Sequence, residues 1–371
     1  MKAVRIAVLS IGLFLAFTPF EWAGTYYSVA IGVLAPLLAI SIVHPVSIIQ
    51  ALEKPDACWL LLGAIALHML AIKPAPLPMT LGLIAAGVAA ASLARFGTHF
   101  RASIHTAARI VLIVQIAGLA IQWLSLLMTG EAVSLHEMVF PVSGDRTGSE
   151  LAGVTRLGGF QLEPGTYSAW VAMLIAFCRL WKGRFGFIDY VGIASILGTY
   201  SAMGVAFVAV LTGWVLLDAL RSLRLLPVVS SMTIALLIGF WAASLGVATY
   251  LENRFLETSG ETSVAGREKP LRAWLDSDTA DKLIGAGFKR GDCTQEVCSR
   301  ELGFGFNVIS SGGLLGIAGL AAFSIFLALG SPSDKLIELA FAILIALMAK
   351  AAPSALAPWL VLFALADENR A

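Results

Sequence analysis

Long apolar runs separated by short polar connections dominate the chain. Most of these runs contain roughly 17 to 25 residues, the length that an α-helix needs to cross the hydrocarbon core of a bilayer. Unpaired backbone polar groups are costly in lipid, so the runs are expected to be helical. The pattern predicts one membrane domain, residues 1–371, with about twelve spans over residues 5–20, 25–43, 57–72, 77–94, 108–127, 164–181, 187–199, 204–220, 227–250, 306–329, 336–350 and 354–366.

The first run follows Lys2 and Arg5 and could be mistaken for a signal peptide. Glu21 and Trp22 stand where a small-x-small cleavage site would have to lie, and a second apolar run begins at once. We therefore expect the first run to be a retained helix.

Composition supports the same class of protein. Of the 371 residues, 58% are hydrophobic and 13% are charged. A soluble domain carries about 25% charged residues, so this chain has too little polar surface to face water on all sides. The expected fold is an all-α, polytopic integral membrane protein. The net charge of +1 gives no bias toward nucleic acid as a partner.

Lysine and arginine are unevenly distributed among the short connections, and this bias predicts orientation. With both termini in the cytoplasm, the outer turns hold only Lys73 and Lys350. The two long loops, about 129–163 and 251–305, then lie outside. The inner segments hold thirteen cations: Lys2, Arg5, Lys54, Arg95, Arg101, Arg109, Arg179, Lys182, Arg184, Arg221, Arg224, Lys335 and Arg370.

The first outer loop ends on the motif R-L-G-G-F-Q-L-E-P, residues 156–164. Pro164 suits the first turn of a helix, and Glu163 suits the positive end of its dipole. The glycines at 158 and 159 allow a tight backbone path. Two interpretations follow: a helix cap with a turn, or an anion site that contains Arg156.

The second outer loop contains G-R-E-K-P-L-R-A-W-L, residues 266–275, and then L-I-G-A-G-F, residues 283–288. An amphipathic helix around Trp274 could lie on the membrane surface, with Arg267 and Arg272 at headgroup depth. Arginine binds phosphate through a planar fork of donors. The alternative is a solvated basic face attracted to anionic lipid.

Two further patterns in this loop raise the question of metal or disulfide chemistry. Asp276, Asp278 and Asp281 do not have EF-hand spacing and favour the start of a helix over a metal site. Cys293 and Cys298 could form a disulfide in an oxidising compartment, and no histidine is nearby to complete a zinc site. We therefore predict neither a metal nor a cofactor.

Few ionisable residues fall inside the apolar runs, which argues against an ion-coupled carrier. His68 is expected to be a packed core residue, and His136 is expected at the outer surface. Lys350 lies near the outer end of its run, where it could snorkel or bind an anion. Cys58 and Cys178 are expected to be apolar filler.

The motifs, in this order, resemble the O-antigen polymerase and ligase superfamily of bacterial envelope proteins, which includes exopolysaccharide polymerases of the Wzy type. The resemblance covers roughly residues 150–330. It rests on R-x-x-G-x-x-x-E-P from Arg156 to Pro164, the G-R pair at 266–267, G-x-G-F at 285–288, and the segment from Asn307 to Gly316.

The resemblance implies an enzyme of the bacterial inner membrane that works on undecaprenyl-pyrophosphate-linked oligosaccharide at the periplasmic face. Repeat units are polymerised without a metal or cofactor, so fixed cations must stabilise the leaving pyrophosphate. Arg156 and Arg267 are the candidates for this role, and Glu163 is the candidate general base. Membrane lipid, a chain-length regulator and a flippase are the expected partners. Candidate substrate-binding residues are Arg254, Arg272, Gly285, Gly287, Asn307 and Lys350.

Two departures from the family pattern keep alternatives open. Ligases of the family carry an external histidine late in the chain, but none follows His136 here. Ala202 follows Tyr200 and Ser201 where an arginine is common in the family. The alternatives are transfer of a finished glycan to a lipid or protein acceptor, and a non-catalytic carrier or flippase for lipid-linked glycan.

Overall fold

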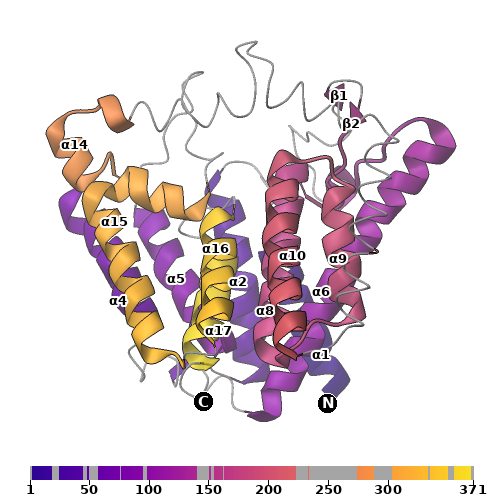
Figure 1. Ribbon diagram of the computed structural model, residues 1–371, viewed down its shortest axis with the longest axis horizontal. Coiled ribbons are helices and arrows are strands. Elements are labelled where there is room, and N and C mark those ends of the chain that lie inside the picture. The colour runs from indigo at the N-terminus through magenta and orange to yellow at the C-terminus, as the bar shows by residue number, and fades with distance from the viewer. Residues whose placement is uncertain are drawn as a thin grey trace.

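The protein is a bundle of helices that run between two ends of the molecule (Figure 1). Helix α1 begins and helix α17 ends at the same end, whereas α14 and the short strands β1 and β2 lie at the opposite end. The computed structural model describes residues 2–18, 25–44, 48–49, 57–75, 77–94, 98–139, 150–151, 154–161, 163–222, 233, 274–287, 303–332, 335–349 and 355–368.

The first half of the bundle is built from helices in its described residues. Its elements are α1 (Lys2–Ala16), α2 (Thr25–Val43), α4 (Ala57–Leu67), the π-helical turn η1 (His68–Ile72), α5 (Leu77–Ala94), α6 (Thr98–Thr129) and α7 (Leu135–Val139).

The second half begins after a two-residue antiparallel pairing between β1 (Glu150–Leu151) and β2 (Val154–Thr155). Its helices are α8 (Pro164–Lys182), α9 (Phe187–Leu197), α10 (Ala202–Ser222), α14 (Thr279–Ile284), α15 (Phe304–Gly330), α16 (Leu336–Met348) and α17 (Leu356–Glu368).

The all-α prediction is confirmed for the described residues. Eleven of the predicted spans fall on them, and each coincides with a helix: α1, α2, α4 with η1, α5, α6, α8, α9, α10, α15, α16 and α17. Apart from residue 233, the predicted span at 227–250 lies outside the described residues.

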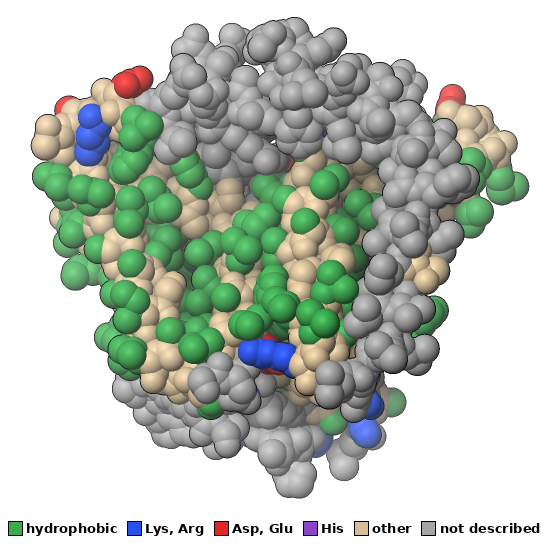
Figure 2. All heavy atoms as spheres, in the orientation of Figure 1, with side chains coloured by type: hydrophobic (Ala, Val, Ile, Leu, Met, Phe, Trp, Pro, Cys, Tyr) green, Lys and Arg blue, Asp and Glu red, His purple; other side chains and the backbone are tan. Residues whose placement is uncertain are grey.

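Three helical stretches are long and apolar enough to cross a membrane: Ala102–Thr129, Ala202–Arg221 and Phe304–Gly330. Large apolar side chains on them remain exposed, for example Leu329 at 83% and Leu220 at 63%. Figure 2 shows hydrophobic side chains across the middle of one face, with charged side chains toward its upper and lower margins. This distribution suits a surface that faces lipid between two aqueous layers.

Helix α8 forms the centre of the bundle. Every residue from Pro164 to Leu180 is buried, and α6, α9, α10, α16 and α17 pack around it. Helix α17 is the second buried helix, because its residues from Leu356 to Ala366 are covered and it packs against α5 and α8. These two helices form much of the interior on which the non-helical segments rest.

Both cysteines inside the bundle belong to this interior. Cys58 and Cys178 are buried with free thiols, so the prediction that they fill apolar space is confirmed.

Candidate functional site

Two stretches of non-helical backbone lie at the end of the bundle opposite the start of α1 (Figure 1). The first is the β2–α8 segment, residues 155–163, of which residue 162 is not described. The second is the turn after α14, residues 285–287, which meets a break in α15. These two segments contain every predicted site residue that the structure describes, apart from Asn307 on α15.

The β2–α8 segment is buried at its two glycines and held by one side chain of α6. The Gln122 Oε1 atom accepts hydrogen bonds from the backbone N–H groups of Gly158 at 3.2 Å and Gly159 at 2.7 Å. Gly159 has φ +62°, and a Cβ there would lie 3.3 Å from the backbone nitrogen of Leu119. The segment needs glycine at this position because the chain is left-handed and lies against α6.

A pair of glutamines ties the segment to the residues just after α1. The Gln161 side chain donates from Nε2 to the carbonyl of Phe17 at 2.7 Å and to Oε1 of Gln115 at 3.1 Å. Gln115 in turn donates to the hydroxyl of Thr18 at 3.0 Å. All four residues are buried, and buried polar groups are stable only with such partners. The segment is therefore fixed by the bundle.

His136 also belongs to this support, so its predicted place at the surface is wrong. Its side chain is fully buried, and Nδ1 donates to the carbonyl of Phe160 at 2.8 Å. Phe160 lies in the segment before α8, where its carbonyl is partly shielded from water and needs a donor. His136 supplies that donor from the short helix α7.

Arg156 and Glu163 flank this anchored stretch, and both are half-buried. Glu163 is the N-cap residue of α8, with extended backbone and Pro164 at the first helical position. Its Oε1 atom accepts a hydrogen bond from the Thr166 hydroxyl at 3.1 Å. The predicted helix cap is confirmed. The anion-binding role of Arg156 and the general-base role of Glu163 stay predictions.

Ala202, at a position where members of the O-antigen polymerase and ligase superfamily often carry arginine, is buried at the start of α10. The preceding Tyr200 has φ +49° and packs edge-on against Trp123, with 5.8 Å between ring centroids. Burial raises the pKa of Tyr200 to about 12, so its hydroxyl stays protonated at neutral pH. This corner is closely packed and holds small or neutral side chains.

The turn after α14 docks on a break in α15. Gly313 has φ +58° and ψ −145°, which interrupts the helical hydrogen-bond ladder. The carbonyls of Ser310 and Ser311 instead accept hydrogen bonds from the N–H groups of Ala286 at 3.1 Å and Gly287 at 3.0 Å. Irregular backbone inside a helical bundle is stable only when its polar groups find partners in this way.

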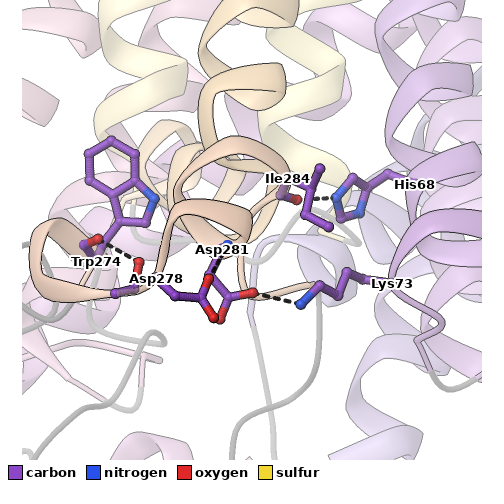
Figure 3. A network of polar contacts seen from close by, with 7 residues as sticks. His68, Lys73, Trp274, Asp278, Asp281 and Ile284 are labelled. Atoms are coloured by element: carbon purple, nitrogen blue, oxygen red, sulfur yellow. Dashed lines mark hydrogen bonds and ion pairs between the residues drawn. The ribbon is translucent and has the colours of Figure 1, made fainter.

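The end of α4 holds α14 from the other side (Figure 3). His68 donates from Nε2 to the carbonyl of Ile284 at 2.5 Å, and Lys73 forms an ion pair with Asp281 at 2.6 Å. His68 starts the π-helical turn η1, and Lys73 follows it. His68 is buried, as predicted, but it joins two elements through a hydrogen bond.

Packing explains the two predicted glycines of this turn. A Cβ on Gly285 would lie 2.1 Å from the carbonyl oxygen of Ser311, and one on Gly287 would lie 2.9 Å from the Cβ of Lys73. Both residues have positive φ, at +79° and +89°. Asn307 is buried in the first half of α15, one turn before the docking carbonyls. Contact of these three residues with substrate stays a prediction.

The aspartates before α14 act at the start of a helix, as predicted. Asp278 is its N-cap and accepts a hydrogen bond at Oδ1 from the N–H of Asp281 at 2.7 Å. In the part of the chain that the structure describes, no group of three or more His, Cys, Asp or Glu residues could hold a metal ion.

The described site residues form two separate groups. Gly285, Gly287 and Asn307 surround the α14–α15 junction, whereas Arg156 and Glu163 precede α8, on the other side of the same end in Figure 1. Other predicted residues lie outside the described residues, namely Arg254, Arg267, Arg272, Lys350, Cys293 and Cys298.

The supporting glutamines and Lys73 were not among the predicted site residues. One signal for them is present in the sequence: Gln115 and Gln122 are seven residues apart in an apolar run, which places both on one face of a helix. A comparison with protein-family models, curated proteins and solved structures finds no match to this chain.

Proposed function

We propose that the protein is a membrane glycosyltransferase that polymerises undecaprenyl-pyrophosphate-linked oligosaccharide repeat units into exopolysaccharide or O-antigen. The observation that carries this proposal is the position of Arg156. It stands at the start of a glutamine-anchored segment, seven residues before Glu163, the N-cap residue of α8. Departure of a pyrophosphate requires a fixed cation, and attack by the acceptor hydroxyl requires a base; this segment begins on a cation and ends on a carboxylate.

The proposed membrane arrangement has twelve spans, with both termini in the cytoplasm and both long loops in the periplasm of the bacterial inner membrane. Two features support it. Eleven helices occupy the predicted positions, and the beginning of α1 and the end of α17 lie at one end of the bundle. An even number of crossings returns the chain to the side on which it started.

In the proposed reaction, the bond between the anomeric carbon of the growing chain and its lipid pyrophosphate breaks. A hydroxyl oxygen of the acceptor repeat unit forms the new glycosidic bond, and its proton moves to the Glu163 carboxylate. The pyrophosphate leaves on its lipid, and Arg156, with Arg267 and Arg272, stabilises the negative charge that develops. The hydroxyl of Thr166 orients Glu163 for this role.

Replacing Arg156 by alanine is expected to abolish long-chain polysaccharide, because removing one fixed charge-stabilising donor costs about 10²–10³-fold in rate. Polysaccharide ladders on gels, with protein amount measured in the membrane fraction, give the readout. Arg156→Lys should yield little more long-chain polysaccharide than Arg156→Ala, since a point charge does not reproduce the guanidinium fork. Arg221→Ala, which removes an exposed cation at the other end of the bundle, is the matched control. Normal ladders from Arg156→Ala would overturn the proposal.

Replacing Glu163 by glutamine tests the general base separately. The cap of α8 should survive, because the Glu163 carbonyl still accepts from the N–H groups of Thr166 and Tyr167 at 3.1 Å. We expect polymer to fall by about 10²-fold or more, the usual contribution of a general base, with unchanged thermal stability. A full-length ladder from Glu163→Gln would assign the base to another residue.

A deletion strain separates the two glycan-transfer reactions. Loss of polymer with single repeat units still attached to the acceptor indicates a polymerase. Long chains that accumulate on the lipid carrier indicate a ligase. Purified protein that moves lipid-linked glycan across vesicles but never extends it would indicate a carrier.

A further inference from the structure

Two cations converge on one point at the end of the bundle where α1 begins. They are Arg109, about three turns into α6, and Lys182, the last residue of α8. A Cβ built on Gly186, in the turn between α8 and α9, would lie 3.2 Å from both Arg109 Nη1 and Lys182 Nζ, and 3.4 Å from Arg109 Nη2. The guanidinium and the ammonium therefore border the same small volume beside the Gly186 backbone.

Among the described side chains, these two cations have fewer carboxylates nearby than would neutralise their charge. The nearby carboxylate is that of Asp189, which is buried and accepts a hydrogen bond at Oδ2 from the Gly186 N–H at 2.6 Å. Arg109 and Lys182 both interact with it electrostatically, but neither forms an ion pair or hydrogen bond with another described residue. Like charges held together repel, so two cations with one carboxylate leave room for an anion.

Other cations nearby do not change this balance. Arg179 is matched by Asp218 and Glu338, with which it forms ion pairs at 2.9 Å and 2.6 Å. His105 lies one helical turn before Arg109, close enough to interact with both cations. Arg184 in the same turn is exposed. The volume beside Gly186 thus lies in a positive field.

The surface beside the two cations is apolar. Phe187, next to Gly186, is 77% exposed, and Ile110 and Ile113 on α6 are 38% and 46% exposed. A pair of cations at the edge of an apolar helical surface is an arrangement that suits phospholipid headgroups, with the acyl chains against the apolar side chains. A soluble phosphate would gain nothing from the exposed Phe187.

We propose that Arg109, Lys182 and the turn at Gly186 form a binding site for the phosphate group of an anionic phospholipid. The Arg109 fork takes two phosphate oxygens, and Lys182 supplies a point charge. With the orientation proposed above, the site faces the cytoplasmic leaflet, whose anionic lipids attract basic clusters. The site itself does not depend on the proposed enzymatic activity.

Native mass spectrometry of the full-length protein in detergent tests this site, with phosphatidylglycerol, phosphatidylcholine or inorganic phosphate added in turn. We expect a retained adduct with phosphatidylglycerol only. The double variant Arg109→Gln/Lys182→Gln should weaken it about 25-fold, as expected for two cations that each contribute about fivefold to anionic-lipid binding. The matched control Lys2→Gln/Arg221→Gln removes two cations from the same end and should leave the adduct unchanged.

A second pair of variants keeps both cations. Gly186 is the N-cap residue of α9, where aspartate and asparagine are both favoured, so neither variant should hinder folding. Gly186→Asp places a carboxylate between the two cations and should abolish the adduct, whereas Gly186→Asn adds the same bulk without the charge and should weaken the adduct less. Unchanged lipid binding in Gly186→Asp, or in Arg109→Gln/Lys182→Gln, would refute the site. A variant-sensitive adduct with inorganic phosphate but not with phosphatidylglycerol would refute the lipid assignment.

Discussion

Replacing Arg179 by methionine should destabilise the helical bundle by about 3 kcal/mol, because it leaves carboxylates in the interior without their cation. The Arg179 side chain is 2% exposed and forms ion pairs with Asp218 of α10 and Glu338 of α16. The Glu338 side chain is only 18% exposed, whereas Asp218 is 33% exposed and partly screened by solvent. We therefore expect the lower end of the range for a broken buried pair.

The arginine also packs against two aromatic rings that contact each other edge to face. Its guanidinium carbon lies 5.4 Å from the ring centroid of Phe185 and 5.7 Å from that of Trp214. Methionine preserves much of this apolar packing, so the variant mainly removes the charge. The loss should appear as a lower thermal midpoint of the purified protein in detergent.

A charge-matched variant gives the control. Arg179→Met/Asp218→Asn/Glu338→Gln removes all three charges and should recover most of the lost stability, since replacing a whole buried ion cluster by neutral groups is far less costly than breaking it. Arg184→Met, at an exposed cation of the same end, should change the midpoint little. A single variant as stable as the wild type would show that the cluster does not hold α8, α10 and α16 together.

Replacing Gly285 by alanine should detach α14 from the break in α15. The backbone at Gly285 has φ +79° and ψ 168°, a region in which residues other than glycine are strained by about 1–3 kcal/mol. The added Cβ would also lie 2.1 Å from the Ser311 carbonyl oxygen, a backbone atom that cannot rotate away. Strain and clash therefore act at the same residue.

Hydrogen exchange measures this detachment directly. The amides of Ala286 and Gly287 donate to the carbonyls of Ser310 and Ser311, so they should be protected in the wild type and exchange quickly in Gly285→Ala. The matched control is Gly183→Ala. Gly183 has φ +70° and ψ 3°, and nothing lies within 4 Å of its added Cβ. The control should lose only about 1–2 kcal/mol of stability through backbone strain. Equal protection of the Ala286 and Gly287 amides in both variants would contradict the docking.

The helix positions could be predicted closely where apolar runs have sharp polar ends. The ranges of α2 and α5 agree with the predicted ones at both ends. Helix α6 begins at Thr98, ten residues before the predicted start at 108. Hydropathy marks the part of a helix that suits lipid, but His99, Arg101 and His105 are polar residues that extend the same helix beyond that part.

The contacts between distant segments could not be predicted. The break at Gly313 lies inside an apolar run that the sequence pattern predicts as one span. The break is stable because the N–H groups of Ala286 and Gly287 donate to the carbonyls that the helix leaves without partners. His136 looked like a surface residue because no local pattern shows that it bonds to Phe160. Single-sequence patterns describe neighbours along the chain, whereas these bonds join segments that only the fold brings together.

Part of the candidate site was nevertheless accessible from sequence. Proline after glutamate predicted the start of α8 because proline fits the first helical turn, and the structure places both residues there. The buried state of the preceding glycines depends on Gln122, which was not predicted. The chemistry proposed for Arg156 and Glu163 rests on their residue types and on this position, and it awaits the variants described above.

The burial of α8 has a consequence for biosynthesis. Its neighbours include α16 and α17, which the ribosome makes only after α9, α10 and α15. When α8 leaves the ribosome, the helices that cover much of its surface do not yet exist, so the buried Arg179 meets Glu338 only late. The centre of the bundle is therefore completed only after synthesis of α17. Nascent chains that end before α17 should stay bound to the insertion machinery, which covers the exposed surface of α8.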